Sequence, residues 1–565
     1  MQRLASRLAL LPLGLLLAYL SVVPLVLLGL ASLKPEGFLD DEGWTFAHYR
    51  TVYLGKELWP LLVNTLIFAL GSTAAALFLG TLLAWLVERT DLPGRGVVRL
   101  MIILPLATPP LLLAIAWVLL LSPRTGFFNF ALMDMFGLGA APFNIFSMTG
   151  MIFVETMVLL PSVYLMLAPA FRNMDPNLEH AAFVSGASVW TVVTRIVLPL
   201  LRPAILAASV FMLIVCLVVF DVPGTIGMPV RIFVVSTLVY VWAAESPTGL
   251  PLYGQIAALA LLFVVLLIGL GLIYQQLSLQ GQRFATISGK GYRPRPMPLG
   301  RWRWPATAAV WIYFFLATIA PLAVLLVTSL LPFQTRITWE ALERLTLDHH
   351  LAFLTNPRLL LAVKNTVIVA VVSATAVAML SLIVSWAVVR SRAPGRRVID
   401  LLAFLPVGIP GVMIGVALIT VYLTFTAIPI YGTIWILIVA YTTTFLAYGT
   451  RTTNGVMLQL HRDLEEAATV AGAGYWRVLH RIVLPLALPA VFAVWVWVVA
   501  HAARELSSAL MLHGRHNTVI STLLWNFWSG GDGPRAAAVG VWLMLALFVL
   551  VGLWQAISQR QEARN

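Results

Sequence analysis

The sequence predicts an all-α polytopic membrane protein with twelve transmembrane helices, arranged as two parallel six-helix repeats. Of the 565 residues, 60% are hydrophobic and only 10% are charged, and the mean hydropathy is +0.93. This composition is typical of a chain whose apolar side chains face lipid. Residues 179–203 also recur as residues 465–489 at a constant offset, which indicates an internal duplication.

The predicted spans are apolar runs long enough to cross the hydrocarbon core of a bilayer. The prolines Pro105, Pro161 and Pro406 lie inside or near these runs and are candidates for helix kinks. In the first half the spans are 8–31, 60–87, 98–121, 148–171, 200–221 and 254–278, and in the second half they are 305–331, 361–389, 398–423, 432–450, 486–508 and 537–557.

The distribution of positive charge predicts the orientation of these spans. The net charge is +13, and most of the 36 lysines and arginines fall in the short segments on one side of the predicted spans. Such a bias marks the cytoplasmic side, so both termini are expected there. Scattered cations beside apolar runs argue against nucleic acid as a partner and fit contact with membrane lipid instead.

The two halves match well beyond the repeated segment. An even number of spans separates the copies, so the halves share one orientation and form a parallel repeat. The extra residues of the first half are expected around Pro123 to Ser147, where the offset between the halves drops. The other matches, all at one larger offset, are Asn64-Thr65 with Asn365-Thr366, Trp85 with Trp386, Pro93-Gly94-Arg95 with Pro394-Gly395-Arg396, and Leu104-Pro105 with Leu405-Pro406.

The domain organisation follows from this duplication. Residues 1–279 form the first half, with a cytoplasmic loop at 175–200, and residues 305–565 form the second half, with a loop at 461–486. Residues 280–304 between them are rich in Gly, Pro and Arg and have no apolar period, so they are predicted to be a cytoplasmic linker.

The repeated segment is predicted to be a short cytoplasmic helix in each half. In the first copy Glu179, Ala182, Gly186 and Trp190 follow at spacings that place them on one helical face. The second copy has the same residue types at Glu465, Ala468, Gly472 and Trp476. A glycine inside a helix costs about 1 kcal/mol relative to alanine, so its repetition suggests that small size serves a close approach by another surface.

These residues carry a family resemblance. The pattern Glu-x-Ala-Ala-x-x-x-Gly, followed by Ile-x-Leu-Pro, resembles the EAA loop of the permeases of ATP-binding-cassette (ABC) importers. The resemblance implies that each loop forms a coupling helix that docks on one of two copies of a separate ATPase subunit. The first copy has His180 where the second has Glu466, so the two docking contacts are expected to differ in charge.

No enzyme active site is expected in this chain. It has no Gly-x4-Gly-Lys-Ser/Thr run and no His-Glu-x-x-His or paired Cys-x-x-Cys spacing. The single cysteine, Cys216, lies in an apolar run and is predicted to be a small apolar filler. We therefore expect no catalytic residue, metal site or cofactor here, with ATP and Mg bound by the partner ATPase.

A few ionisable residues lie inside or at the ends of predicted spans and are candidates for a translocation pathway. They are Glu155 in the fourth span, Asp221 at the end of the fifth, and Arg504 and Glu505 at the end of the eleventh. Buried charges in a bilayer are costly and often functional. Polar groups also join neighbouring helices, and residues at helix ends are often solvated, so a structural role is the alternative for each.

A second resemblance concerns the segments after the fifth and eleventh spans. Residues 220–227, and residues 505–512 followed by 518–528, resemble those of fused ferric-iron-type permeases. This implies an importer in the inner membrane of a bacterium that receives its solute from a periplasmic binding protein and moves it by alternating access. Ferric iron is the favoured cargo, with thiamine, phosphonate and polyamine as alternatives. A different class, the ion-coupled secondary transporter, would work without an ATPase.

Overall fold

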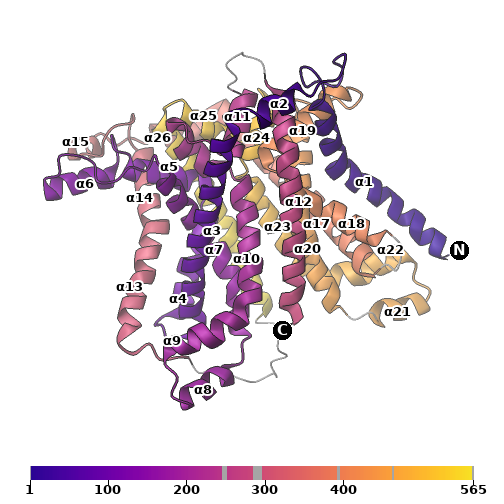
Figure 1. Cartoon of the computed structure of the whole chain (residues 1–565), viewed down its shortest axis with the longest axis horizontal. Coiled ribbons are helices and arrows are strands. Elements are labelled where there is room, and N and C mark those ends of the chain that lie inside the picture. The colour runs from indigo at the N-terminus through magenta and orange to yellow at the C-terminus, as the bar shows by residue number, and fades with distance from the viewer. Residues whose placement is uncertain (1, 245–250, 284–295, 391–394, 461–462, 563–565) are drawn as a thin grey trace.

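The computed structural model describes residues 2–244, 251–283, 296–390, 395–460 and 463–562. Helices dominate these ranges, and an isolated bridge between Thr90 and Met297 is their only β pairing. The predicted all-α membrane fold is confirmed. Figure 1 shows the long helices running roughly side by side, with α8 and α21 near one end and α11 and α25 at the opposite end.

The helices of the first half are α1 (Gln2–Ala31), α2 (Ala47–Tyr53), α3 (Leu58–Arg89), α4 (Arg95–Ile103), η1 (Leu104–Ala107), α5 (Pro110–Leu121), α6 (Phe127–Phe136), α7 (Met148–Arg172), α8 (Pro176–Val184), α9 (Val189–Val192), η2 (Val193–Val197), α10 (Leu198–Val218), η3 (Pro223–Gly227), η4 (Met228–Val230), α11 (Val235–Ala244) and α12 (Tyr253–Arg283).

Those of the second half are η5 (Gly300–Trp302), α13 (Arg303–Phe314), η6 (Phe315–Ile319), α14 (Ala320–Ser329), α15 (Trp339–Leu342), α16 (Asp348–Thr355), α17 (Pro357–Arg390), α18 (Arg396–Phe404), η7 (Leu405–Gly408), α19 (Gly411–Thr424), α20 (Ile434–Gln459), α21 (Asp463–Val470), α22 (Tyr475–Val478), η8 (Leu479–Val483), α23 (Leu484–Ala502), α24 (Ser507–Leu512), α25 (Ile520–Ser529) and α26 (Gly533–Glu562).

The predicted count of twelve spans is not confirmed. Within the described ranges, nine helices are long and apolar enough to cross a membrane, or up to eleven if each of two bent helix pairs counts as one span. Helix α20 is long enough at 26 residues, but threonines and Arg451 interrupt its apolar sequence. One bent pair, Pro223–Val230 with Val235–Ala244, lies where the sequence predicted no span.

Prolines break two of the predicted spans. The third span was expected to be continuous, but Arg95–Ala107 and Pro110–Leu121 meet at a bend of 96°. Its counterpart in the second half, predicted as 398–423, is divided into α18, η7 and α19. Both breaks fall at a later proline, Pro109 or Pro410, which follows an extended residue and lacks the N–H that would continue the helix. Pro161, by contrast, lies inside the continuous helix α7.

Each half is built on a bundle of three long helices: α3, α7 and α10 in the first half, and α17, α20 and α23 in the second. Small residues allow these helices to approach closely, as is usual in membrane bundles. A Cβ added at Gly80 of α3 would collide with Val163 of α7, and one added at Gly449 of α20 would collide with Ser381 of α17.

The first helix of each half packs against the other half. Helix α1 lies along α18 and α19, where Ser21 Oγ donates to the carbonyl oxygen of Leu402 at 2.7 Å and the hydroxyls of Tyr19 and Tyr422 lie 2.6 Å apart. In return, α13 and α14 lie against α4 and α5 of the first half. This exchange joins the halves into one body.

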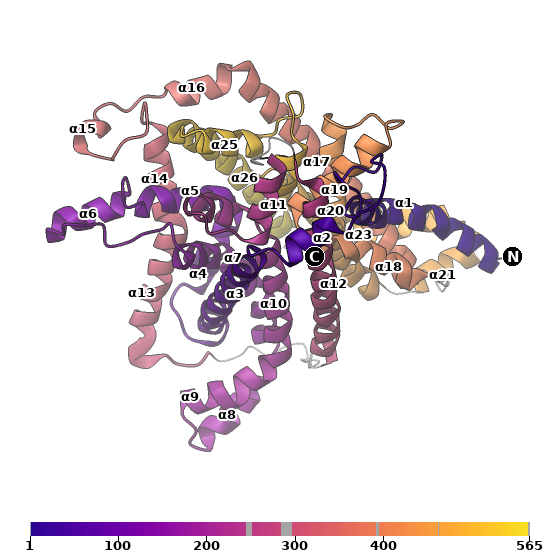
Figure 2. The ribbon, with the colours of Figure 1, turned by 45° about the horizontal axis from the view of Figure 1, so that its top comes forward.

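Two further expectations concern the connecting segments. The extra residues of the first half include α6, which projects away from the bundle near the end that carries α11 and α25 (Figures 1 and 2). Much of the predicted linker, residues 284–295, lies outside the described residues. Its end is described, and the amide of Met297 donates to the carbonyl oxygen of Arg89 at 2.8 Å.

Candidate functional site

The repeated loops begin with α8 and α21, two short helices at the same end of the molecule. Helix α8 starts at a capping aspartate, since the Asp175 carboxylate accepts the amide of Asn177 at 2.9 Å. The alanines Ala182 and Ala468 pack partly buried against the core, whereas Glu466 is exposed. The side chain of His180 lies outside the described part of the chain.

The two repeated glycines do not lie inside a helix, so that part of the sequence prediction is wrong. Gly186 and Gly472 have φ values of +84° and +82°, the left-handed conformation that ends a helix. The turn closes with the amide of Ala187 donating to the carbonyl oxygen of Ala182 at 3.0 Å. The single face predicted through Trp190 is therefore interrupted. Glycine is used here for backbone freedom, and a Cβ at either glycine would meet no atom within 4 Å.

Glu179 is tied to the end of a long helix of its own half. Its carboxylate oxygen Oε2 lies 2.7 Å from Nη2 of Arg89, and its Oε1 accepts from Nε of Arg89 at 3.1 Å. Arg89 also donates to the carbonyl oxygen of Met174 at 3.2 Å. The two side chains are only 3% and 5% exposed, which makes this a buried bidentate pair that fixes α8 to the last turn of α3.

The second half repeats this arrangement. Glu465 of α21 lies 2.9 Å from Nε of Arg390, at the end of α17, and Arg390 donates to the carbonyl oxygen of Leu460 at 2.6 Å. The indole N–H of Trp386 also donates to Glu465, at 3.4 Å. The sequence analysis did not identify either arginine. A sequence signal for them was present, because Arg89 and Arg390 each lie four residues after the tryptophan that is repeated in the two halves.

The repeated Asn-Thr pairs have a structural role at the opposite end. The amide of Val235, at the start of α11, donates to Thr65 Oγ1 at 3.2 Å. Its counterpart, the amide of Ile520 at the start of α25, donates to Thr366 Oγ1 at 2.8 Å. The side-chain amides of Asn64 and Asn365 donate to backbone carbonyls just before the same two helices. These pairs hold α11 against α3 and α25 against α17.

An aromatic cluster marks the place where the halves meet. The indole N–H of Trp525 in α25 donates to the hydroxyl of Tyr240 in α11 at 3.4 Å, and these residues occupy equivalent positions in the two repeats. Phe220 packs against both rings, with centroid distances of 5.2 Å to each. Contact between equivalent residues places this cluster on the pseudo-two-fold axis.

The three predicted acidic residues gather near this cluster. Glu155 of α7 is fully buried, and neither carboxylate oxygen has a hydrogen-bond partner within the described ranges. Glu155 lies near Asp221, which in turn lies near Glu505. Asp221 and Glu505 lie beyond the last residues of α10 and α23 rather than within those helices. An unpartnered buried carboxyl is costly, which supports a role beyond packing.

The neighbouring cation links the halves. Arg504 donates from Nη1 to the carbonyl oxygen of Leu106 at 2.7 Å, in the proline break of the first half, and its Nη2 lies 2.8 Å from His501 Nε2. Glu505 accepts from the amide and hydroxyl of Ser508 at 3.0 and 2.8 Å, which caps α24. Among the described residues, no group of three or more His, Cys, Asp or Glu side chains is placed to hold a metal ion.

Comparison with known proteins agrees with this architecture. Residues 365–563 match the family "Binding-protein-dependent transport system inner membrane component". The ferric transport system permease protein FbpB of Actinobacillus pleuropneumoniae is 25% identical over 561 residues, which cover 96% of this chain and 77% of the relative.

Two further relatives differ in how much of this chain they match. The Fe(3+)-transport system permease protein FbpB 2 of Haemophilus influenzae is 24% identical, over 86% of this chain and 87% of its own length. A putative 2-aminoethylphosphonate transport system permease protein of Salmonella typhi is 28% identical, over 40% of this chain and 77% of its own length. The resemblance found in the sequence is thereby confirmed, since the second half of the chain matches this family and ferric transport permeases are similar to the chain along most of its length.

Proposed function

We propose that this permease imports ferric iron by alternating access, driven by two copies of an ATPase subunit that dock on α8 and α21. The solute would arrive from a periplasmic binding protein. Both termini, α8 and α21 would then face the cytoplasm. The observation that carries the proposal is the duplicated tie between Glu179 and Arg89 and between Glu465 and Arg390.

These ties supply the mechanical link that a coupling helix needs. A displacement of α8 is passed to α3 through the two contacts between Glu179 and Arg89, and a displacement of α21 is passed to α17 in the same way. Because α3 and α17 hold α11 and α25 through Thr65 and Thr366, the same two helices reach the aromatic cluster at the far end.

ATP binding to the partner subunits supplies the free energy difference between inward- and outward-facing states. The nucleotide and its Mg are assigned to the partner because this sequence has no phosphate-binding loop. An ion-coupled secondary transporter would need no such partner, so transport by this chain alone would contradict the proposal.

The acidic cluster supports a cationic cargo. Glu155, Asp221 and Glu505 place carboxyl groups of the two halves close to the axis. Carboxylates there favour a trivalent cation and disfavour a phosphonate anion. Thiamine and polyamines are also cationic, and ferric iron is preferred over them because ferric transport permeases match most of the chain.

The docking proposal is tested with the double substitution Gly186→Trp and Gly472→Trp. We expect the variant to insert into the membrane but to lose co-purification with its ATPase, because a bulky side chain would stand on the proposed docking surface. The matched control is Gly137→Trp with Gly432→Trp, which imposes the same left-handed strain at two other open turns. Wild-type recovery of the ATPase with the first pair would refute docking at these helices.

The cargo proposal is tested by uptake of radioactive iron into vesicles that hold this chain, its ATPase and its binding protein. Asp221→Asn and Glu505→Gln are expected to slow uptake while ATPase co-purification stays normal. Unchanged iron transport by both variants would argue against the acidic pathway. Competition by thiamine, a polyamine or a phosphonate would identify the alternative cargo.

A further inference from the structure

A half-open cavity of about 560 Å³ lies between α17, α18 and α20 of the second half. It is near the end of α17 at which Arg390 binds α21. Its walls are mainly apolar, with four charged side chains among them. The lining residues are Val388, Val389, Arg396, Arg397, Asp400, Leu401, Phe404, Arg451 and Leu458.

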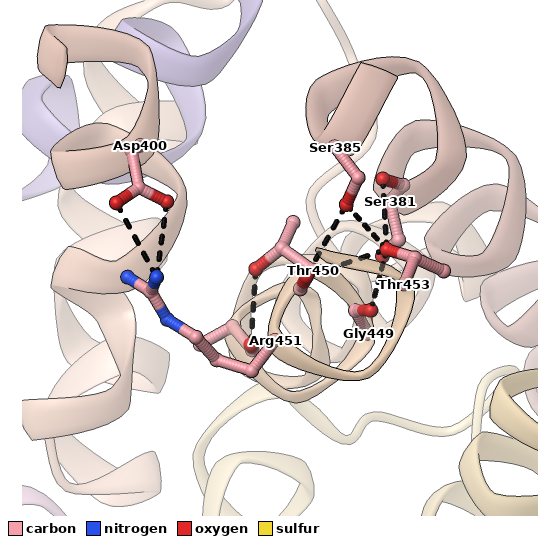
Figure 3. Close-up of polar contacts among 8 residues, drawn as sticks. Ser381, Ser385, Asp400, Gly449, Thr450, Arg451 and Thr453 are labelled. Carbon is pink, nitrogen blue, oxygen red and sulfur yellow. Dashed lines mark hydrogen bonds and ion pairs between the residues drawn. The ribbon is translucent and has the colours of Figure 1, made fainter. Parts of the chain in front are cut away.

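Three arginines and one aspartate line this cavity. Asp400 binds Arg451 through a single guanidinium nitrogen, Nη1, at 3.1 and 3.3 Å (Figure 3). Within the described residues, Nη2 of Arg451 donates no hydrogen bond. Arg397 is exposed on the first turn of α18. The cavity therefore offers positive charge and N–H donors to an anion.

Arg451 is held in place from several sides. Its guanidinium lies over the ring of Phe404, 4.6 Å from the centroid. Behind it, α20 is fixed to α17 by hydrogen bonds, in which Thr453 Oγ1 donates to the carbonyl oxygen of Ser381 at 3.1 Å and Ser385 Oγ donates to that of Thr450 at 3.2 Å (Figure 3). A cation positioned in this way loses little side-chain entropy on binding a ligand.

The equivalent place in the first half is built differently. Glu88 occupies the position of Val389, is buried, and accepts from Arg99 at 2.7 Å and from the hydroxyl of Tyr164 at 2.8 Å. Leu165 occupies the position of Arg451. The first half thus carries its carboxylate on α3, whereas the second half has Val389 there and carries its carboxylate, Asp400, on α18 at the position of Arg99.

We propose that this cavity binds the phosphate group of an anionic phospholipid, in the leaflet on the side of α8 and α21. The arginines match the phosphate, and guanidinium groups bind phosphate oxygens in pairs. The apolar walls match the glycerol and the first acyl carbons, since Leu401 and Leu458 are 48% and 69% exposed beside the charges. Basic pockets between membrane helices on the cytoplasmic side are known lipid headgroup sites.

The experiment is native mass spectrometry of the full chain in detergent, titrated with phosphatidylglycerol or with phosphatidylcholine. Arg397→Gln and the double substitution Arg397→Gln with Arg451→Gln are compared with wild type. We expect wild type to prefer phosphatidylglycerol, Arg397→Gln to weaken its retention several-fold, and the double variant to weaken it about tenfold or more, as the loss of charged phosphate contacts predicts. Arg202→Gln, an exposed arginine on α10, is the control and should leave retention unchanged.

A second arm adds inorganic phosphate in place of lipid. We expect millimolar phosphate to displace phosphatidylglycerol only weakly, because it lacks the apolar contacts. Equal retention by wild type and both variants would overturn the proposed site. Full displacement by phosphate, without preference between the two lipids, would overturn the assignment to a lipid. Because Arg397 is exposed and outside the proposed pathway and docking helices, its variant keeps the test valid if the double variant does not fold.

Discussion

The two ion pairs that anchor α8 and α21 share their connections but differ in burial. The side chains of Arg89 and Glu179 are 3% and 5% exposed, whereas those of Arg390 and Glu465 are 9% and 18% exposed. In both halves the arginine also binds a backbone carbonyl just beyond the end of the preceding helix, at Met174 or Leu460. The duplicated chain has therefore kept the same connection between helices while the surroundings of each charge have changed.

The difference in burial should have its largest effect on stability when one partner of each pair is removed. Arg89→Gln leaves Glu179 buried without a counter-charge, and we expect it to lower the free energy of unfolding by about 3–5 kcal/mol. Arg390→Gln leaves a partly hydrated Glu465, and a loss of about 1.5–3 kcal/mol is expected. Thermal unfolding of the purified variants in detergent measures both. Equal losses would show that burial does not set the strength of these pairs.

Removing both partners of the first pair should restore part of the stability. In Arg89→Gln with Glu179→Gln no charge stays buried, so we expect the double variant to be about 2 kcal/mol more stable than Arg89→Gln alone. The corresponding double variant at Arg390 and Glu465 should recover less. A double-mutant cycle on each pair gives the two coupling energies, and a larger coupling in the second half would contradict the comparison.

The glycine turns should behave alike in the two halves. Gly186→Ala and Gly472→Ala each place a Cβ in the left-handed region at an open site, so the expected cost is about 1–2 kcal/mol for each, from the backbone alone. Asparagine at the same positions should cost less. Thermal unfolding compares the four variants. A large cost at only one glycine would indicate contacts specific to that half.

The smallest expected effect concerns the repeated tryptophans. The indole N–H of Trp386 donates to Glu465, whereas that of Trp85 is buried with no hydrogen-bond partner in the described residues. Replacement by phenylalanine removes the same volume from both sites. We therefore expect Trp386→Phe to cost about 0.5–1 kcal/mol more than Trp85→Phe. If thermal unfolding shows that Trp85→Phe costs more than Trp386→Phe, this proposed difference between the halves is refuted.

Much of the fold could be predicted because apolar length and duplication are properties of the sequence itself. The helices α3 and α17 lie where apolar runs of sufficient length predicted spans, and the Asn-Thr and Trp repeats proved to be structural contacts. Pro105 and Pro406 were predicted only as candidates for kinks, whereas the full breaks at Pro109 and Pro410 were not predicted. Hydropathy continues through them although the backbone hydrogen bonds do not.

The site was predicted only in part, and the reasons are specific. Glu179 and Glu465 were recognised from their motif, but Arg89 and Arg390 lie far away in sequence, and their pairing depends on how α8 folds back onto α3. The glycines were identified as special for the wrong reason, because spacing alone does not distinguish a helix interior from a left-handed turn. The approach of Glu155 to Asp221 depends on the tertiary packing of α7 against the segment after α10.

The exchange of α1 between the halves also constrains how the protein is made. The hydroxyl of Ser21 binds the carbonyl of Leu402, a residue 381 positions later in the chain. At a translation rate of about 5–20 residues per second, that separation corresponds to roughly 20–80 s. During this interval the nascent α1 must remain in the bilayer without its final neighbours, so the first half cannot complete its assembly until the ribosome has passed α18 and α19.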